Sequence, residues 1–463
     1  MNIIEQSKAE ALRKDNNTRM NNAVKNIDFY YNNQYEYTKE EMQKRYPATF
    51  KDIYNYIITV PLTKSLILQL AKIFQRDPEI KPDTDNQNIK DAISIVFDQA
   101  NLFGKLKIID RFTELCGKIG VIPIWNPITK KVGLDILTPD RCIVITDGNF
   151  PDTPIKIMYR INTQSNNLLP ARTDIWAIWT ADTYTEATLK TDYGIDKIIK
   201  EPIPNPYGKI PIAWFELDYP LNCFWNEEYN SIVPQNLRTN IQLTNLDLAL
   251  DYQSFATLCT EGFPDNRELI IGLTRHINIP RDPVSGEAGG KMYYINPNVD
   301  LRQVWEIINQ NIDFTASLLG LSTSAVRQAS AFSSGYQLKL SMQGVIDHNE
   351  DKRSIYIESL RQLTNLICQC ENYYGSQRLP EDIDFNIKFN DIAIAANPIE
   401  EEQIISMRLT NGTMDRAEAI MKHNPDMTRE EAEQRVIEID ASKKQTLNST
   451  TFAPGLFVGA SKN

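Results

Sequence analysis

The chain has few of the residues that catalytic and metal sites need. Its 463 residues include six cysteines and three histidines. The histidines, His276, His348 and His423, lie too far apart for any two to share a local metal motif. The phosphate-binding loop G-x-x-x-x-G-K-[ST], the G-x-G-x-x-G and H-E-x-x-H motifs and the nucleophile motif G-x-S-x-G are all missing. These absences argue against the common nucleotide-dependent, zinc-dependent and serine-hydrolase enzymes, and we expect neither a cofactor nor a catalytic residue.

The cysteines also give no pattern of a metal or disulfide site. Only Cys368 and Cys370 are close together, and positions i and i+2 of a helix lie on different faces. We interpret them as buried apolar thiols rather than metal ligands. A long chain with scattered cysteines is typical of a reducing compartment.

Long apolar runs are missing as well. No stretch of 18 apolar residues occurs, so we predict no membrane span. The first 17 residues, MNIIEQSKAEALRKDNN, carry charges where a signal peptide needs an apolar segment. We therefore expect the protein to stay in the cytoplasm in which it is made.

The charge balance limits how the protein can treat nucleic acid. Acidic residues number 60 and basic residues 49, which gives a net charge of −11. Tight DNA binding needs a basic surface that neutralises phosphates, so this balance argues against a sequence-reading DNA binder. It is compatible with a protein that DNA passes without being held.

The pattern along the chain predicts an α+β protein with long helices. Residues 1–232 read as helices to about residue 118, apart from an Asn- and Tyr-rich interruption, followed by mostly antiparallel strands. A β-hairpin is predicted from residues 120–125 and 131–137, short β-like runs continue to about residue 190, and residues 210–217 close the region. Pro61 must lie at a helix start or a kink.

Two helices with a small β-rich insert come next. We predict helices over 233–262 and 299–320, with Pro234 in the first turn of the former. In the second helix, apolar residues recur at helical spacing and form one packing stripe. The stripe consists of Leu301, Val304, Trp305, Ile308, Ile312, Ala316 and Leu319. The insert, 263–298, has short strands at 268–273 and 291–296 around a Pro- and Gly-rich middle.

Residues 321–333 are the most informative segment. They are mostly small and polar, show no hydrophobic period, and lie between two predicted helices. A structureless connection of this length is functional or is a mobile surface loop, and the helices on either side favour function. The next helix is predicted from Ser334, where Ser334 and Gln337 have capping-box spacing. Gly344 lies inside it, either as a kink or as a tolerated glycine.

The C-terminal part returns to regular patterns. Residues 383–391 alternate between apolar and polar and predict a half-buried strand that returns to the α+β region. Residues 397–442 read as two or three helices, with a second capping box at Thr428 and Glu431. Residues 443–463 contain little that could form a core, so we predict a flexible tail.

Several stretches, in this order, resemble the portal proteins of tailed bacteriophages, in particular the siphophage-type family. They are residues 114–147 (ELCGKIG…CIVITD), the strands IKIMYRI and DIWAIWTADTYTEA, NPYGKIPIAWFEL at 205–217, Ser334-Gly335 ahead of a long helix, and residues 387–439. The resemblance covers residues 25–442.

This resemblance implies a portal fold and a channel. The antiparallel β/α wing would be 1–232, the stem helices 233–262 and 299–320, the clip 263–298, and the tunnel loop 321–333. Residues 334–396 would hold the kinked helix and the strand that returns to the wing, and 397–442 the helical crown inside the head.

The resemblance also assigns roles to particular residues. Ser322, Thr323, Ser324, Arg327, Gln328, Ser330 and Phe332 would face DNA in the tunnel loop. Lys339 and Gly344 would belong to the channel helix. Leu301, Val304, Trp305, Ile308 and Ile312 would pack the stem. Arg275, Arg281 and Lys291 would contact an adaptor from the clip.

The implied assembly is a ring of about twelve subunits at one capsid vertex. Its partners would be double-stranded DNA passing without sequence specificity, the terminase large subunit, a head-tail adaptor, and the major capsid and scaffolding proteins, with no membrane. Two alternatives stay open: another oligomeric head-tail structural or adaptor protein, and an enzyme that processes nucleic acid.

Overall fold

The computed structural model describes residues 3–161, 174–191, 193–225, 232–254, 257–261, 291–295, 300–322, 342–380, 383–391, 398–424 and 427–450. The chain divides into two compact units. The first contains Met1–Ala329 and Ser341–Ala393, and the second contains Ser330–Leu340 and Ile394–Asn463. No helix among the described residues is both long and apolar enough to span a membrane.

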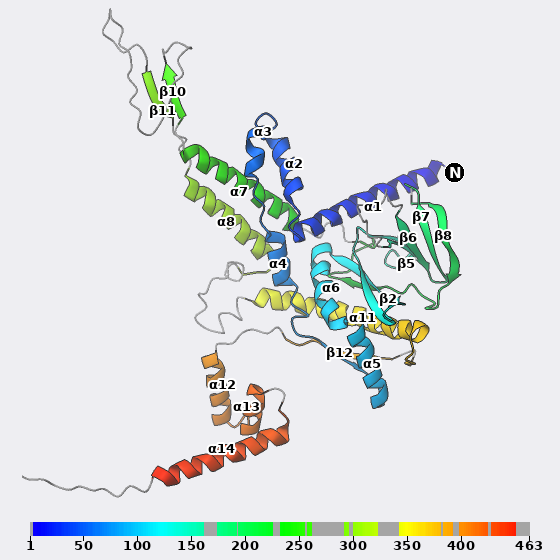
Figure 1. The fold of residues 1–463 in the computed structure, drawn as a ribbon, viewed down its shortest axis with the longest axis vertical. Helices are drawn as coiled ribbons and strands as arrows, with labels where there is room; N and C mark the ends of the chain where they lie inside the picture. The colour runs from blue at the N-terminus through cyan, green and yellow to red at the C-terminus, as the bar shows by residue number, and fades with distance from the viewer. Residues whose placement is uncertain are drawn as a thin grey trace, which may run out of the picture. The chain divides into compact units, whose positions relative to one another are not determined.

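The first unit begins with helices (Figure 1). They are α1 (Ile3–Tyr30), α2 (Tyr35–Arg45), α3 (Phe50–Ile53), the 3₁₀ turn η1 (Tyr54–Tyr56) and α4 (Leu62–Leu70). Pro61 immediately precedes α4, as predicted for a helix start, because a proline ring disrupts the turn before it. Residues 57–61 lie inside the region that was expected to be helical, but they form neither helix nor strand.

The main core lies where helices cover a small sheet. Strands β2 (Lys118–Asn126), β3 (Lys131–Leu137) and β9 (Ala213–Glu216) form an antiparallel sheet in the order β3-β2-β9, which confirms the predicted hairpin. Helices α5 (Gln87–Gln99), α6 (Leu102–Cys116) and α11 (Gln343–Tyr374) pack against it through buried aliphatic and aromatic side chains. Cys368 and Cys370 are buried in this core, as predicted for apolar thiols.

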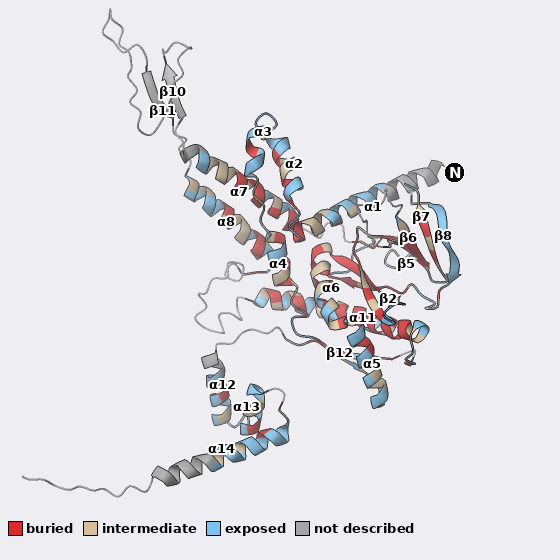
Figure 2. Cartoon of the chain, in the orientation of Figure 1, coloured by how far each residue is buried: buried red, intermediate tan, exposed pale blue. Residues whose placement is uncertain are grey.

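A second, five-stranded sheet is an antiparallel meander. It consists of β4 (Cys142–Thr146), β5 (Pro154–Arg160), β6 (Ile175–Thr180), β7 (Thr183–Leu189) and β8 (Ile195–Pro204), in that order. The sequence did not predict β8, since all ten of its residues are exposed and no buried face imposes an alternation (Figure 2).

One helix prediction is wrong in its end point. The helix expected over 233–262 is α7, Ile232–Ser254, and the chain then forms strand β10, Thr257–Glu261. Strand β10 pairs antiparallel with β11, Lys291–Ile295, because β-branched residues such as Thr257 and Thr260 suit a strand once a partner is available. The strand predicted at 268–273 lies outside the described residues.

The helix predicted over 299–320 is α8, Leu301–Leu318. Asp300 caps its first turn, since the Asp300 side chain accepts hydrogen bonds from the backbone N–H groups of Arg302 at 3.0 Å and Gln303 at 3.1 Å. Figure 1 shows α7 and α8 side by side, with β10 and β11 at the end where α7 stops and α8 starts.

The start of the long helix predicted from Ser334 differs from the prediction. Helix α11 begins at Gln343 rather than at Ser334, which lies outside the described residues. Gly344 is therefore in the first turn of α11 and is not an interior kink. The predicted strand is β12, Phe385–Lys388, and it returns to the first unit by pairing with a strand that was not predicted, β1, Glu79–Pro82.

The second unit is helical, as expected. It contains α12 (Pro398–Thr410), α13 (Arg416–His423) and α14 (Arg429–Thr450). The capping box at Thr428 and Glu431 is confirmed, because the Thr428 N–H donates to Glu431 at 2.9 Å and the Glu431 N–H donates to Thr428 at 3.4 Å. Helix α14 continues past residue 442, so the tail predicted from residue 443 is helical as far as Thr450.

Candidate functional site: the stem helices and the loop anchor

The predicted stripe on α8 is only partly covered within one chain. Ile308 and Ala316 are buried, and Leu301, Val304, Ile312 and Leu319 are partly buried. Trp305 is 49% exposed. The centre of the stripe is therefore buried, and Trp305, the largest side chain of the stripe, lies at its exposed edge.

A second apolar face of α8 is largely exposed among the described residues. Ile307, Phe314 and Leu318 are 47%, 60% and 63% exposed. They are seven and four residues apart, so they share one face of the helix. Sequence reasoning missed this face because the stripe at 301–319 accounted for most of the apolar residues. The only available signal was the excess of apolar residues over one stripe.

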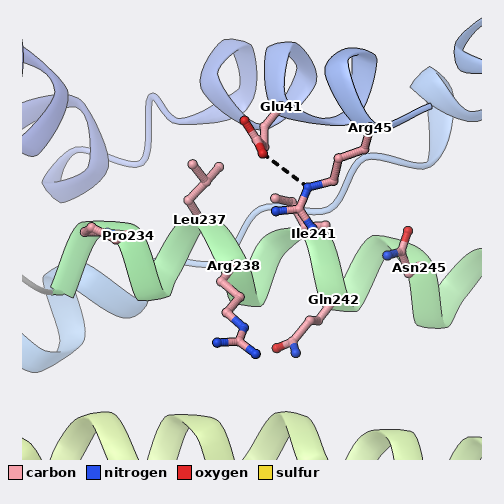
Figure 3. Close-up of a pocket in the computed structure, with 8 residues that line it drawn as sticks. All are labelled: Glu41, Arg45, Pro234, Leu237, Arg238, Ile241, Gln242 and Asn245. Atoms are coloured by element: carbon pink, nitrogen blue, oxygen red, sulfur yellow. Dashed lines mark hydrogen bonds and ion pairs between the residues drawn. The ribbon is translucent and has the colours of Figure 1, made fainter. Parts of the chain in front are cut away.

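Helix α7 lies between α2 and α8 and carries a groove on its surface (Figure 3). The groove has a volume of about 450 Å³, and its lining comes from one face of α7 and from two residues of α2. The lining residues are Glu41, Arg45, Pro234, Leu237, Arg238, Ile241, Gln242 and Asn245.

The groove has an apolar floor and charged walls. Ile241 is buried in a small cluster with Met42 and Ile53, and Leu237 packs against that cluster. Arg45 on α2 pairs with Glu41, Nε to Oε1, at 3.2 Å. Figure 3 shows Arg238 and Gln242 extending from α7 away from α2. Such a floor with charged edges can receive an apolar side chain that has a polar neighbour.

A ladder of polar side chains on a different face of α7 fixes the helix to the first unit. The backbone N–H groups of Ile58, Val60 and Thr63 donate to side-chain oxygens of Thr244, Asn240 and Asn236, at 3.0, 3.0 and 2.9 Å. The Asn240 amide also donates to Gln34 at 3.1 Å and to Thr38 at 3.2 Å.

This ladder explains how residues 57–61 keep their hydrogen bonds without forming a helix or a strand. The asparagine and threonine side chains of α7 are spaced four residues apart, so they lie one above another and take the place of a strand partner. The ladder satisfies buried backbone groups that would otherwise be costly. Sequence reasoning missed it, although the spacing of Asn236, Asn240 and Thr244, four residues apart, was a usable signal.

The chain before the predicted tunnel loop, at Gly320, meets the start of α11, at Gly344, through a pair of glycines. Gly320 follows α8 with φ of 70°, a left-handed conformation typical of the residue that ends a helix. A Cβ placed on Gly344 would overlap the carbonyl oxygen of Gly320 and lie 3.1 Å from its Cα. Only glycine fits at 344, because the two backbones touch there.

The residues predicted to face DNA, to belong to the channel helix or to contact an adaptor can be only partly placed. Ser322 is described, partly buried, next to the buried Leu321. Lys291 is the first residue of β11, in register with Glu261. The others lie outside the described residues: Thr323, Ser324, Arg327, Gln328, Ser330, Phe332, Lys339, Arg275 and Arg281. The roles of all these residues stay predictions.

Helix α11 is held to α6 by a buried charge cluster. Lys352, with a side chain 1% exposed, bonds through Nζ to Asp110 at 3.0 Å and to Glu114 at 2.5 Å. The Tyr356 hydroxyl donates to Asp110 at 3.2 Å, and His348 Nε2 lies 2.8 Å from Glu114. The second carboxylate oxygens of Asp110 and Glu114 are buried and have no hydrogen-bond partner among the described residues.

Burial and charge act against each other in this charge cluster. Burial raises the pKa of Asp110 above its ordinary value despite the nearby ammonium of Lys352. Burial alone would also raise the pKa of Glu114, but Lys352 and His348 outweigh it and lower that pKa. Burial alone would lower the pKa of Lys352, and the two carboxylates raise it instead. Lys352 is thus the cation that keeps two buried acids in place.

Comparison with known proteins identifies the family. The model of the family described as "Phage portal protein, SPP1 Gp6-like" matches residues 9–446. The chain belongs to the phage portal protein family. The family predicted from the order of the motifs is confirmed, and it is a family of virion structural proteins rather than of enzymes. No curated protein matches the chain.

Solved structures of gene transfer agent (GTA) particles are similar to this portal-family chain at low identity. A chain from the neck of an empty GTA particle, computed with C6 symmetry, has 11% identity and a TM-score of 0.42, covering 78% of this chain and 90% of that one. A chain from the virion of a native GTA particle has 11% identity and a TM-score of 0.40, covering 78% and 89%. One from the neck of a native GTA particle with C12 symmetry has 10% identity and a TM-score of 0.39, covering 78% and 88%.

Proposed function

We propose that this protein forms a ring of about twelve copies at one vertex of a phage capsid and that double-stranded DNA passes through its channel. The observation that carries the proposal is the family match over residues 9–446. In this role the ring nucleates head assembly, admits DNA during packaging and releases it during ejection. The protein itself performs no chemistry, and the energy for DNA movement comes from a separate terminase motor.

The uncovered apolar surface of the stem supports self-association. Ile307, Phe314 and Leu318 expose large side chains on one helix face. Contiguous apolar surface of this kind marks contact sites in soluble proteins. A repeated contact between two different faces closes into a ring when the rotation between copies allows it. Identical copies placed side by side would cover the stem faces that one chain leaves open.

The charge of the chain supports passage of DNA over binding. A net charge of −11 per copy places a negative field around the assembled ring. Such a field opposes adhesion of a phosphate backbone. The small polar residues of 321–333 are the part of the chain we assign to the channel surface. The insert at 263–298 is the part we assign to the head-tail adaptor and the terminase large subunit. The helical second unit would face the head interior, and major capsid and scaffolding proteins would surround the ring.

Imaging and mass measurement test the ring directly. The purified full-length chain should give closed particles with a central hole in negative-stain images and a mass near twelve copies by native mass spectrometry. A chain that stays monomeric at high concentration and in isolated particles contradicts the proposal.

The loop assignment has its own test. Deleting residues 323–332 should leave ring assembly intact and reduce the amount of DNA packaged or retained. In the matched control, the same ten positions are replaced by Gly and Ser, which keeps the length of the segment and removes the wild-type side chains. If the deletion abolishes ring formation, the segment is structural and the assignment fails.

A further inference from the structure

We propose that the groove on α7 receives the indole of Trp305 from the adjacent copy of this chain. This inference rests on the proposed function, because the occupant is a neighbouring subunit of the ring. It assigns a specific pair of surfaces to the contact: the groove of one copy and the Trp305 edge of α8 in the next.

The first step is to identify which face of the stem contains the groove. The amide of Asn311 on α8 lies 3.5 Å from the side-chain oxygen of Gln242, which lines the groove. At about 100° per residue, Ile307, Phe314 and Leu318 all lie within about 60° of Asn311 around α8. The groove and these exposed side chains therefore belong to one surface, which we call the groove face.

The second step follows from ring symmetry. In a closed ring of more than two copies, each copy contacts its two neighbours through two different faces. The groove face of one copy cannot meet the groove face of the next. The side chain that fills the groove must come from another face of the neighbour.

The third step selects the side chain. The large apolar residues of α7 and α8 that are exposed outside the groove face, within the described residues, are Leu250 and Trp305. Trp305 lies about 120° around α8 from Asn311, so it points away from the groove face. An indole is the larger of the two and can stack on a guanidinium such as that of Arg45 or Arg238. Tryptophan is also a residue type that commonly anchors interfaces by filling a pocket.

The fourth step is charge. In the part of the chain that the structure describes, no carboxylate lies within ion-pair distance of Arg238, and no cation lies within that distance of Glu306. Both side chains are exposed. Glu306 directly follows Trp305, so an indole in the groove brings an unpaired carboxylate toward the unpaired guanidinium of Arg238. Each copy thus supplies a carboxylate, Glu306, to the Arg238 guanidinium of the next copy.

Cross-linking of the full-length chain tests the contact. In a Cys223→Ser background, Asn245→Cys places a thiol in the groove and Asn309→Cys places one a single helical turn from Trp305. Under mild oxidation the protein with both added cysteines should give a ladder of covalent multimers on a non-reducing gel, and each protein with only one added cysteine should not. Only a link between copies can produce a ladder.

Assembly measurements provide a second readout. Trp305→Ala should raise the concentration needed for half-maximal ring formation at least tenfold, and the matched control Leu250→Ala should change it less than threefold. Circular dichroism of both variants should equal that of the wild type, because both residues are about half exposed.

The outcomes separate the two proposals. Wild-type rings with no ladder and an unchanged assembly concentration for Trp305→Ala overturn the groove assignment and leave the ring intact. A wild-type chain that forms no ring overturns both. A ladder together with a weakened Trp305→Ala ring supports the contact.

Discussion

Replacing Lys352 with methionine should be among the most damaging single changes in the first unit. The side chain is 1% exposed and bonds to both Asp110 and Glu114. Methionine fills much of the volume but brings no charge, so two buried carboxylates lose their shared cation. Removing one partner of a buried ion pair typically lowers the free energy of unfolding by about 3–5 kcal/mol.

The pH dependence of that loss has a definite sign. In the variant, burial without Lys352 raises the pKa of both carboxyl groups in the folded state above their unfolded values. A raised carboxyl pKa penalises folding at neutral pH, and the penalty shrinks as pH falls through the raised pKa, because the folded protein then binds the proton. The Lys352→Met protein should therefore lose most at pH 7 and less near pH 5.

The assay is urea unfolding followed by circular dichroism at both pH values. The matched control is Lys107→Met, on the same helix as Asp110, because Lys107 is exposed and its ion pair with Asp77, at 3.3 Å, is worth about 1 kcal/mol or less. Adding Asp110→Asn and Glu114→Gln to Lys352→Met should recover much of the loss at pH 7. A loss below about 1 kcal/mol, or an equal loss at both pH values, would refute this account of the charge cluster.

Two further substitutions test the stem and the loop anchor. Gly344→Ala should destabilise the chain by about 1–3 kcal/mol in thermal unfolding, because the new methyl group meets the backbone of Gly320, although alanine normally favours a helix. The control is Gly148→Ala, because a Cβ at that position would have no atom within 4 Å. Equal effects of the two substitutions would contradict the close approach of Gly320 and Gly344. Asn240→Ala should lower the free energy of unfolding by about 2–4 kcal/mol, because it leaves the Val60 N–H and the Gln34 amide oxygen without a partner. The exposed Asn88→Ala should change it by less than about 0.5 kcal/mol, and a similarly small change for Asn240→Ala would mean that water replaces the ladder.

Local patterns predicted the elements whose own residues decide their structure. The hairpin at 120–137 and the α8 stripe depend on alternation or helical spacing, and both are present. The capping box at Thr428 depends on two residues three apart. In such cases a short window of sequence contains the physical cause.

The features that the sequence did not predict have a different cause: each depends on contact with residues that are distant in the sequence. Strand β10 forms because residues 291–295 are available to pair with it, and β8 forms as an exposed edge of β7. The charge cluster joins Asp110 to Lys352 across 242 positions, although Asp110 and Glu114 four apart on a helix were a visible hint. The excess of apolar residues on α8 hinted at a second apolar face at Ile307, but the sequence does not show which of the two faces meets α7.

The contact between Gly320 and Gly344 has a consequence for how portal chains can vary in length. Because the backbones of Gly320 and Gly344 are in contact, the residues between them form a closed loop of the chain, whatever their conformation. The entropic free-energy cost of closing a loop grows only with the logarithm of its length. It rises by about 0.6 kcal/mol for each doubling of the length when the added residues are flexible. Residues can therefore be added or removed between the two glycines while α8 and α11 keep their positions, and in the proposed ring such changes would alter the width of the channel without changing these helices.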